Sequence, residues 1–138
     1  MIRAALVVAL SLAANAASAA TIPTQTALLE GLDKTTARVS RFEAPVGSPV
    51  HFGTLTITVR DCEKNPPEDT PESAAFLEID EARQGENKTR LFSGWMFASS
   101  PALSALEHPV YDVNVLDCKM ASGSSPAASG KSEGNTAR

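Results

Sequence analysis

Residues 51–62, HFGTLTITVRDC, constrain the fold of this chain more than any other stretch. Leu55, Ile57 and Val59 alternate there with threonines and an arginine, so that apolar side chains recur at every second position. This period of two places the three apolar residues on one face of a β-strand, and β-branched residues on both faces suit a pleated, half-buried surface. The run therefore predicts a strand that turns one face toward a core.

Short strand-like stretches separated by turn residues make up the rest of the body. Residues 63–73 hold three prolines and four acidic residues and are expected to form a solvated loop. A polar turn at 84–88 is expected to join two strands as a hairpin. Ser100 followed by Pro101 predicts a short helix or a helical turn over 100–107. The spacing predicts an all-β, mainly antiparallel domain, either a small β-sandwich or a partly open barrel with one short helix. The expected strands are 35–42, 51–62, 74–80, 89–98 and 110–118.

The two ends of the chain differ in composition from this body. Residues 1–19 combine Arg3, a short apolar run and small residues that end in Ala-Ser-Ala, which is typical of a cleavable signal peptide. A helix of nine apolar residues reaches about 13 Å, against about 30 Å of hydrocarbon, so no transmembrane span is expected after cleavage. An uncleaved short anchor is the alternative. Residues 121–138 hold no aromatic and no branched apolar residue and are expected to be disordered. We therefore expect one domain over 24–120 in a periplasmic protein.

Cys62 and Cys118 are the only cysteines, and an even number of cysteines in an exported chain favours one disulfide. Two free thiols, or a bond to another chain, are the alternatives. Cys62 shares its parity with Thr58 and Arg60, and Cys118 shares its parity with Asn114. In regular strands both sulfur atoms would leave the more polar face, which predicts a bridge at sheet edges or strand ends unless a bulge intervenes.

Composition and motifs argue against several functional classes. The formal net charge is −4, whereas nucleic acid and anionic lipid both attract basic surfaces. The sequence contains no C-x-x-C pair of a redox centre and no G-x-x-x-x-G-K loop of a phosphate site. No cofactor, no metal site and no catalytic constellation is therefore expected, and the chain is interpreted as a protein that is not an enzyme.

Residues that often carry chemistry are interpreted here as structural. Two histidines 57 residues apart give no metal-ligand spacing and are expected to be ordinary surface residues. Acidic residues at strand ends more often protect an edge than act as an acid–base pair, and the serines that follow residue 98 lack a G-x-S-x-G elbow around them. These residues are His51 and His108, then Asp61, Asp112 and Asp117, and finally Ser99, Ser100 and Ser104.

Residues 91–106, LFSGWMFASSPALSAL, form the most apolar stretch of the body. In a strand, Phe92 and Met96 would share one face, and Leu91, Trp95 and Phe97 would share the other. A strand that is apolar on both faces is either buried on both faces or presents one face to a partner. Since tryptophan and methionine often anchor protein interfaces, Trp95, Met96 and Phe97 are a candidate partner surface, with a place in the core as the alternative.

Three segments together carry a family resemblance: FSGWMFASSPALSALEHPVYDVNVLDC at 92–118, FGTLTITVRDC at 52–62 and PPEDTPESAAF at 66–76. They resemble a family of small secreted alphaproteobacterial proteins catalogued only as domain of unknown function 2155. The resemblance implies a periplasmic address and a cysteine pair at Cys62 and Cys118, and it implies no activity. Similar proteins carry tryptophan where this chain has Asn114, which places that position at a surface or in a contact that this protein has lost.

These observations favour a non-catalytic envelope protein that binds or supports another envelope protein, without indicating an oligomeric state. The alternative is a periplasmic domain that binds a small ligand at the open end of a sandwich or barrel. An enzyme built on strand-end acids is the third reading, which a pocket joining a buried carboxylate to His51 or His108 would favour.

Overall fold

The structure, a computed structural model, describes residues 20–120. The expected signal peptide at 1–19 and the expected polar tail at 121–138 lie outside these residues. No helix within the described range is long and apolar enough to cross a membrane. The elements are, in order, β1 (Ile22–Pro23), β2 (Thr26–Asp33), β3 (Arg38–Pro45), β4 (Val50–Phe52), β5 (Leu55–Lys64), β6 (Ser73–Glu81), β7 (Thr89–Phe97), the 3-10 turn η1 (Pro101–Leu103) and β8 (Tyr111–Lys119).

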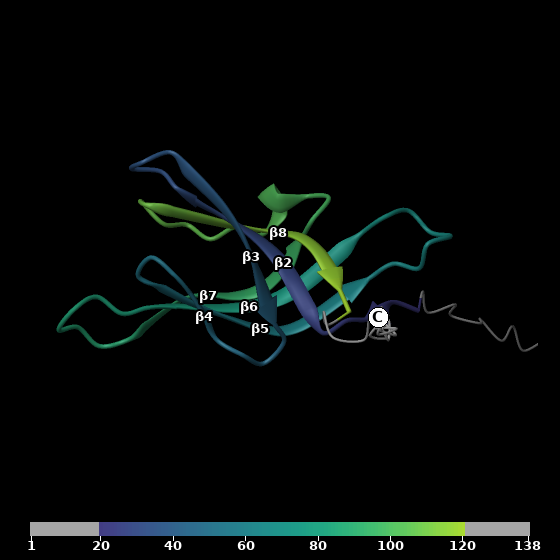
Figure 1. Ribbon diagram of the computed structural model, residues 1–138, viewed down its shortest axis with the longest axis horizontal. Helices are drawn as coiled ribbons and strands as arrows, with labels where there is room; N and C mark the ends of the chain where they lie inside the picture. Colours follow the sequence, from purple (N-terminus) through teal and green to yellow (C-terminus); the bar gives the residue numbers. More distant parts are fainter. Residues whose placement is uncertain (1–19, 121–138) are drawn as a thin grey trace, which may run out of the picture.

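Two antiparallel sheets lie against each other (Figure 1). The large sheet has the strand order β1-β5-β6-β7, with β4 also paired to β5. The small sheet has the order β3-β2-β8. Because the two sheets do not close into a barrel, the prediction of an all-β fold is confirmed in the form of a sandwich.

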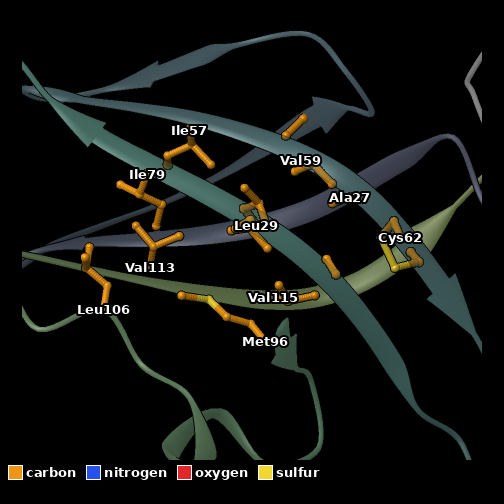
Figure 2. Close-up of a cluster of buried hydrophobic side chains, with 14 of the residues drawn as sticks. Ala27, Leu29, Ile57, Val59, Cys62, Ile79, Met96, Leu106, Val113 and Val115 are labelled. Atoms are coloured by element: carbon orange, nitrogen blue, oxygen red, sulfur yellow. A yellow bond between two sulfur atoms is a disulfide. The ribbon is translucent and has the colours of Figure 1, made fainter. Parts of the chain in front are cut away.

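Alternate residues of both sheets fill the space between them, as expected for packed sheets. Leu55, Ile57 and Val59 of β5 are fully buried, on the face that their alternation predicts. Val113 and Val115 of β8 meet them from the small sheet and are also buried. Figure 2 shows this cluster, whose other members include Ala27, Leu29, Ile79, Met96 and Leu106.

The expected hairpin is present, because β6 and β7 pair around the polar turn at 84–88. The stretch at 51–62 differs from the single strand that was expected, since β4 ends at Phe52 and β5 begins at Leu55. Gly53 makes the turn between them with φ +57°, a conformation that favours glycine. A Cβ at Gly53 would also collide with the ring of Tyr111, so this turn needs glycine for two reasons.

The central strand of the small sheet, β2, is not among the strands expected from the sequence. Ala27 and Leu29 are buried and alternate with half-buried Leu28 and Glu30, as a strand requires. Its sequence, TALLEGLD, has only one β-branched residue, so the local preference for a strand is weak. Pairing with β3 on one side and β8 on the other overrides that preference.

The neighbouring strand, β3, covers 38–45 rather than the expected 35–42. Asp33 accepts hydrogen bonds from the backbone N–H groups of Thr35 and Thr36, at 2.9 and 3.2 Å, and Ala37 adopts φ +55°. These residues form the turn between β2 and β3, so the strand begins after them.

Of the short helix or helical turn expected over 100–107, only the single turn η1 forms. Pro101 takes the first position, but the side chain of Ser100 makes no capping hydrogen bond and Ser104 is already extended. The extended backbone that follows carries Leu106 and His108 into the interior, where they are 4% and 7% exposed. Burial of these two side chains decides the conformation of the segment over the local helix signal.

Cys62 and Cys118 form a disulfide that joins β5 of the large sheet to β8 of the small sheet, with Cα atoms 5.7 Å apart. Both residues are fully buried, and Figure 2 shows the bond at one end of the apolar cluster, with Leu106 toward the other. The cysteines do lie near the ends of their strands. The prediction that both sulfur atoms leave the polar faces is wrong.

A β-bulge in each of the two strands explains the error. The pairing register shifts at Arg60 in β5 and at Leu116 in β8, so each strand holds one residue without a facing partner. One extra residue moves all that follow to the opposite face. Cys62 therefore faces inward together with Val59, and Cys118 faces inward from β8.

Candidate functional site

Trp95 lies near the C-terminal end of β7, on the outer face of the large sheet. Its facing partner in β6 is Phe76, and the two rings meet edge to face with centroids 5.6 Å apart and planes at 80°. This geometry is favourable for aromatic pairs. Trp95 nevertheless remains 37% exposed, so part of this residue is free for a further contact.

The three residues of the candidate partner surface divide between the two faces of β7. Phe97 shares the outer face with Trp95 and is half-buried, whereas Met96 is 2% exposed and belongs to the core. Sequence reasoning missed Phe76, although its alternation with buried Ala75 in AAFLEID carried the signal. We call Phe76, Trp95 and Phe97 the aromatic surface.

Ion pairs border the aromatic surface on the same face of the large sheet. Arg60 donates to Glu78 at 3.0 Å, and Arg90 lies 3.4 Å from the same carboxylate. Arg90 also donates to Asp80 at 2.6 Å, and Lys88 is 3.4 Å from Asp80. The hydrogen bond from Arg90 holds the pKa of Asp80 below its usual value, against the opposing effect of burial. The aromatic surface thus has a charged border whose side chains are already paired.

Ser99 and Glu72 form a second polar contact just beyond the end of β7. The backbone N–H of Ser99 donates to Glu72 at 3.1 Å, and the Ser99 hydroxyl donates to the same carboxylate. Burial raises the pKa of Glu72, but these hydrogen bonds and one from the N–H of Ser73 outweigh it and lower the pKa. The hydroxyl of Ser99 is therefore bound to a carboxylate and has no histidine as a base.

The two histidines lie in different environments. His51 is exposed, with Nδ1 3.3 Å from the hydroxyl of Thr56. His108 is buried, so the prediction of a surface histidine is wrong at this position. Its Nδ1 accepts the backbone N–H groups of Val110 and Tyr111 at 3.0 and 3.1 Å. Because Nδ1 is an acceptor, the ring proton lies on Nε2.

Nε2 of His108 lies 2.8 Å from the carboxylate of Glu81, which completes the hydrogen bonding of the ring. The same carboxylate oxygen accepts the hydroxyl of Thr54 at 2.7 Å. The Thr54 hydrogen bond lowers the pKa of Glu81 most, the bond to His108 adds to it, and burial opposes both. His108 also stacks on Tyr111, with ring centroids 5.2 Å apart, so its bonds hold the start of β8 against the end of β6.

The acidic residues at the strand ends lie in different environments and do not form a pair. Asp112 pairs with Lys34 at 3.0 Å. Asp117 accepts the hydroxyl of Ser73 at 3.0 Å and the N–H of Cys118 at 2.8 Å, and these bonds lower its pKa although burial raises it. Asp61 is half-buried directly after the bulge in β5. Among residues 20–120 no group of three histidine, cysteine or acidic side chains is arranged to hold a metal ion.

A hollow of about 560 Å³ lies where β1, the proline-rich loop and the end of β8 come together. Its volume falls within the range of small-molecule sites, about 300–1,000 Å³. Neither histidine is among the residues around it. Apolar groups provide most of the surface of the hollow. Its charged residues are Lys64, Asp69, Glu72, Asp117 and Lys119, and its apolar residues are Ile22, Pro66, Pro67, Pro71 and Met120.

Comparison with known proteins places the chain in a family. Residues 27–118, which include β3 to β7 and all but one residue each of β2 and β8, match the model of a family described as "Uncharacterized protein conserved in bacteria (DUF2155)". The chain belongs to the DUF2155 family. The resemblance inferred from the three sequence segments is thereby confirmed.

One relative, also described as uncharacterised, is "Uncharacterized protein RP359" of Rickettsia prowazekii (strain Madrid E). It is 34% identical to this chain over 87 residues. The match covers 63% of this chain and 56% of the relative, so the chain spans little more than half of that protein. No solved structure gives a significant match. Asn114 is half-buried and lines a shallow hollow of about 310 Å³ beside Pro101, Ala105 and Leu106.

Proposed function

We propose that this DUF2155 domain is an exported, periplasmic protein-interaction module without catalytic activity, and that it binds its partner through the aromatic surface. The observation that carries the proposal is Trp95, which is 37% exposed on the outer face of the large sheet. The cysteine pair at disulfide distance is compatible with export, because disulfides persist in oxidising compartments.

The aromatic surface has the composition of an interface centre. Tryptophan is enriched among the residues that dominate binding energy. It contributes most where a partner excludes water from its ring. The edge-to-face contact with Phe76 holds the ring of Trp95 in place before binding, which reduces the entropy lost on association. The paired charges of Glu78, Asp80 and Arg90 provide a polar rim around this centre.

The contacts of the polar residues support a non-catalytic role. His108 uses both ring nitrogens in structural hydrogen bonds, and the carboxylate of Glu81 is shared between His108 and Thr54. A general base needs a lone pair directed at a substrate. The buried histidine–carboxylate pair of this domain is instead used to connect β6 to β8.

The test is crosslinking of the tagged mature protein in its own bacterial envelope, followed by identification of the captured protein. Trp95→Ala removes the centre of the aromatic surface, and Met96 is kept because it is part of the core. Val39→Ala is the matched control, since Val39 is 56% exposed on β3 of the small sheet. We expect one protein to be captured by the wild type and by Val39→Ala but not by Trp95→Ala, with all three folded by circular dichroism. Equal capture by Trp95→Ala would contradict the proposed site.

A second candidate function is small-ligand binding in the hollow of about 560 Å³, which Ile22 and Met120 border. Its size and apolar lining favour this reading. A fluorescent apolar probe such as anilinonaphthalene sulfonate would then bind the folded protein, and Ile22→Asp would abolish binding while Trp95→Ala would not. Probe binding that depends on Trp95 and not on Ile22 would exclude the hollow as the site.

A further inference from the structure

Strand β7 forms one edge of the large sheet. It pairs with β6, and within residues 20–120 no other strand pairs with its second side. An edge strand presents a row of backbone N–H and C=O groups that can bind another strand. The residues of β7 that bear the aromatic surface, Trp95 and Phe97, lie on this edge.

The hydrogen-bond pattern shows which backbone groups face outward. Ala98 donates its N–H to the carbonyl of Ser73 at 2.9 Å, directly continuing the ladder in which Phe97 faces Ala74. Facing pairs in an antiparallel ladder alternate between bonded and non-bonded. Even-numbered residues of β7 therefore bond to β6 beyond the register shift near Leu91, and Ser93 and Trp95 direct their N–H and C=O groups away from it.

The other long edge strands carry charges or proline that discourage pairing. β3 contains Arg38, Arg41 and Pro45, and β8 contains Asp112, Asp117 and Lys119. The opposite edge of the large sheet is formed by β1 and β4, which have two and three residues. In contrast, residues 91–97 of β7, LFSGWMF, contain neither a charge nor a proline.

We infer that a second copy of this chain binds at β7, with the two β7 strands antiparallel around a two-fold axis. This inference rests on the proposed function, because it names the partner of the same surface. The pairing would join two large sheets into one continuous sheet and would place the Trp95 rings of both copies on the same outer face. A two-fold contact requires a self-complementary strand, and β7 meets that condition.

Two pairing registers near the middle of β7 fit the hydrogen-bond pattern, and in both of them the two strands are complementary. With the axis at Gly94, Ser93 faces Trp95 of the other copy, and Phe92 faces Met96. With the axis at Trp95, Ser93 faces Phe97, and Gly94 faces Met96. In each register every side chain of residues 91–97 faces an uncharged residue, so no like charges are opposed.

A second copy fits this edge better than the chain's own C-terminal residues. Residues 121–138 are mainly Ser, Ala and Gly, which pair poorly as strands. Two seven-residue stretches make a contact smaller than the standard interface of about 1,600 Å². We therefore expect a dimer that dissociates on dilution rather than a permanent one.

The test is sedimentation equilibrium of the purified mature protein, from low micromolar concentration to the highest that remains soluble. Ser93→Lys places a charge on the exposed edge, where the monomer tolerates it because Glu78 faces this position. Val39→Lys is the matched control, with the same charge added to the edge strand of the small sheet. We expect the wild type and Val39→Lys to dimerise alike, and Ser93→Lys to weaken the dimer at least about tenfold.

The outcomes separate this inference from the proposed function. A dimer that Ser93→Lys leaves unchanged, or a monomer at every concentration, overturns pairing at β7. If the protein is monomeric but still captures an envelope protein in a Trp95-dependent manner, the aromatic surface binds a different partner and the proposed function stands. If it is monomeric and captures nothing, both proposals are wrong.

Discussion

Gly31, within β2, leaves the space that the ring of Phe52 occupies. A Cβ at this position would lie 2.6 Å from the ring, well inside the contact distance of two carbon atoms. The ring cannot turn away freely, because it stacks on Phe42 with centroids 5.5 Å apart and meets Tyr111 at 5.3 Å. The backbone of β2 is held by pairing on both sides. A single missing methyl group therefore determines how this part of the core is packed.

Gly31→Ala is accordingly expected to lower the free energy of unfolding by about 1–3 kcal/mol, the usual cost of overpacking a core. Urea denaturation measures the effect as a lower midpoint with an unchanged slope. Gly94→Ala is the matched control, because a Cβ at Gly94 in β7 has its nearest neighbour at an ordinary 3.4 Å. Equal midpoints for the two variants would show that the Phe52 ring has room to move.

His108 is a second single residue that stabilises the fold, through hydrogen bonds rather than through the space that it fills. Its replacement by alanine removes one of the partners of Glu81, which keeps its bond from Thr54, and leaves the N–H groups of Val110 and Tyr111 without their acceptor in a partly buried site. Since each unsatisfied buried group costs about 1–3 kcal/mol, we expect His108→Ala to destabilise the domain by about 2–4 kcal/mol. His51→Ala, at an exposed position, is expected to change stability by less than about 0.5 kcal/mol. Thermal unfolding of both variants makes the comparison, and equal melting temperatures would rule out this role for His108.

At the scale of elements, the bulge in β5 decides which side chains reach the core. Deleting Arg60 would leave Val59 facing Leu77 and Asp61 facing Phe76 in a regular ladder, so Val59 and Cys62 would still face inward. We therefore expect the deletion to keep the bond between Cys62 and Cys118, so that a thiol reagent adds no mass to the unfolded protein. The bond closes a separation of 56 residues and is worth about 4 kcal/mol in the chain-entropy model.

Arg60→Ala is the control for that deletion. It keeps the length of β5 and removes only the partly exposed ion pair with Glu78, a contact worth up to about 1 kcal/mol. The disulfide should therefore form normally in this variant. Free thiols in the deletion but not in Arg60→Ala would mean that the pairing of β5 with β6 does not set the direction of Cys62.

Strands with a strong period of two could be predicted from the sequence, and the elements that depend on partners could not. Leu55, Ile57 and Val59 face the core because alternation alone fixes a face. β2 was not predicted, because its residues favour a strand only when β3 and β8 pair with it. The bulges were equally hidden, since an extra residue becomes evident only when the facing strand supplies the register.

At the scale of the whole molecule, the arrangement of layers determines which predicted face becomes a surface. The sequence predicts that Met96 and Trp95 point to opposite sides of β7. It does not reveal that the small sheet and Leu106 of the following segment pack on the side of Met96, which leaves the side of Trp95 open. The candidate site therefore depends on long-range packing, whereas its residues follow from local alternation.

The pH dependence of stability is also a property of the whole domain, because carboxylates on several elements contribute to it. Hydrogen bonds and ion pairs hold the pKa values of Glu72, Asp80, Glu81 and Asp117 below their usual range, and burial opposes the shift in each. A pKa that is lower in the folded than in the unfolded chain stabilises the fold above the unfolded value. That contribution is lost as the pH falls through the folded value.

Urea midpoints measured from neutral to acidic pH should therefore begin to fall near the unfolded values, about 4.3 for Glu and about 3.9 for Asp, and continue to fall below them. Asp80→Asn removes one of the shifted groups and its bond to Arg90. This variant should be less stable at neutral pH and lose less stability on acidification, because its side chain has no proton to take up. A decline as steep as that of the wild type would mean that Asp80 keeps its usual pKa, and that other carboxylates carry the acid sensitivity of the sandwich.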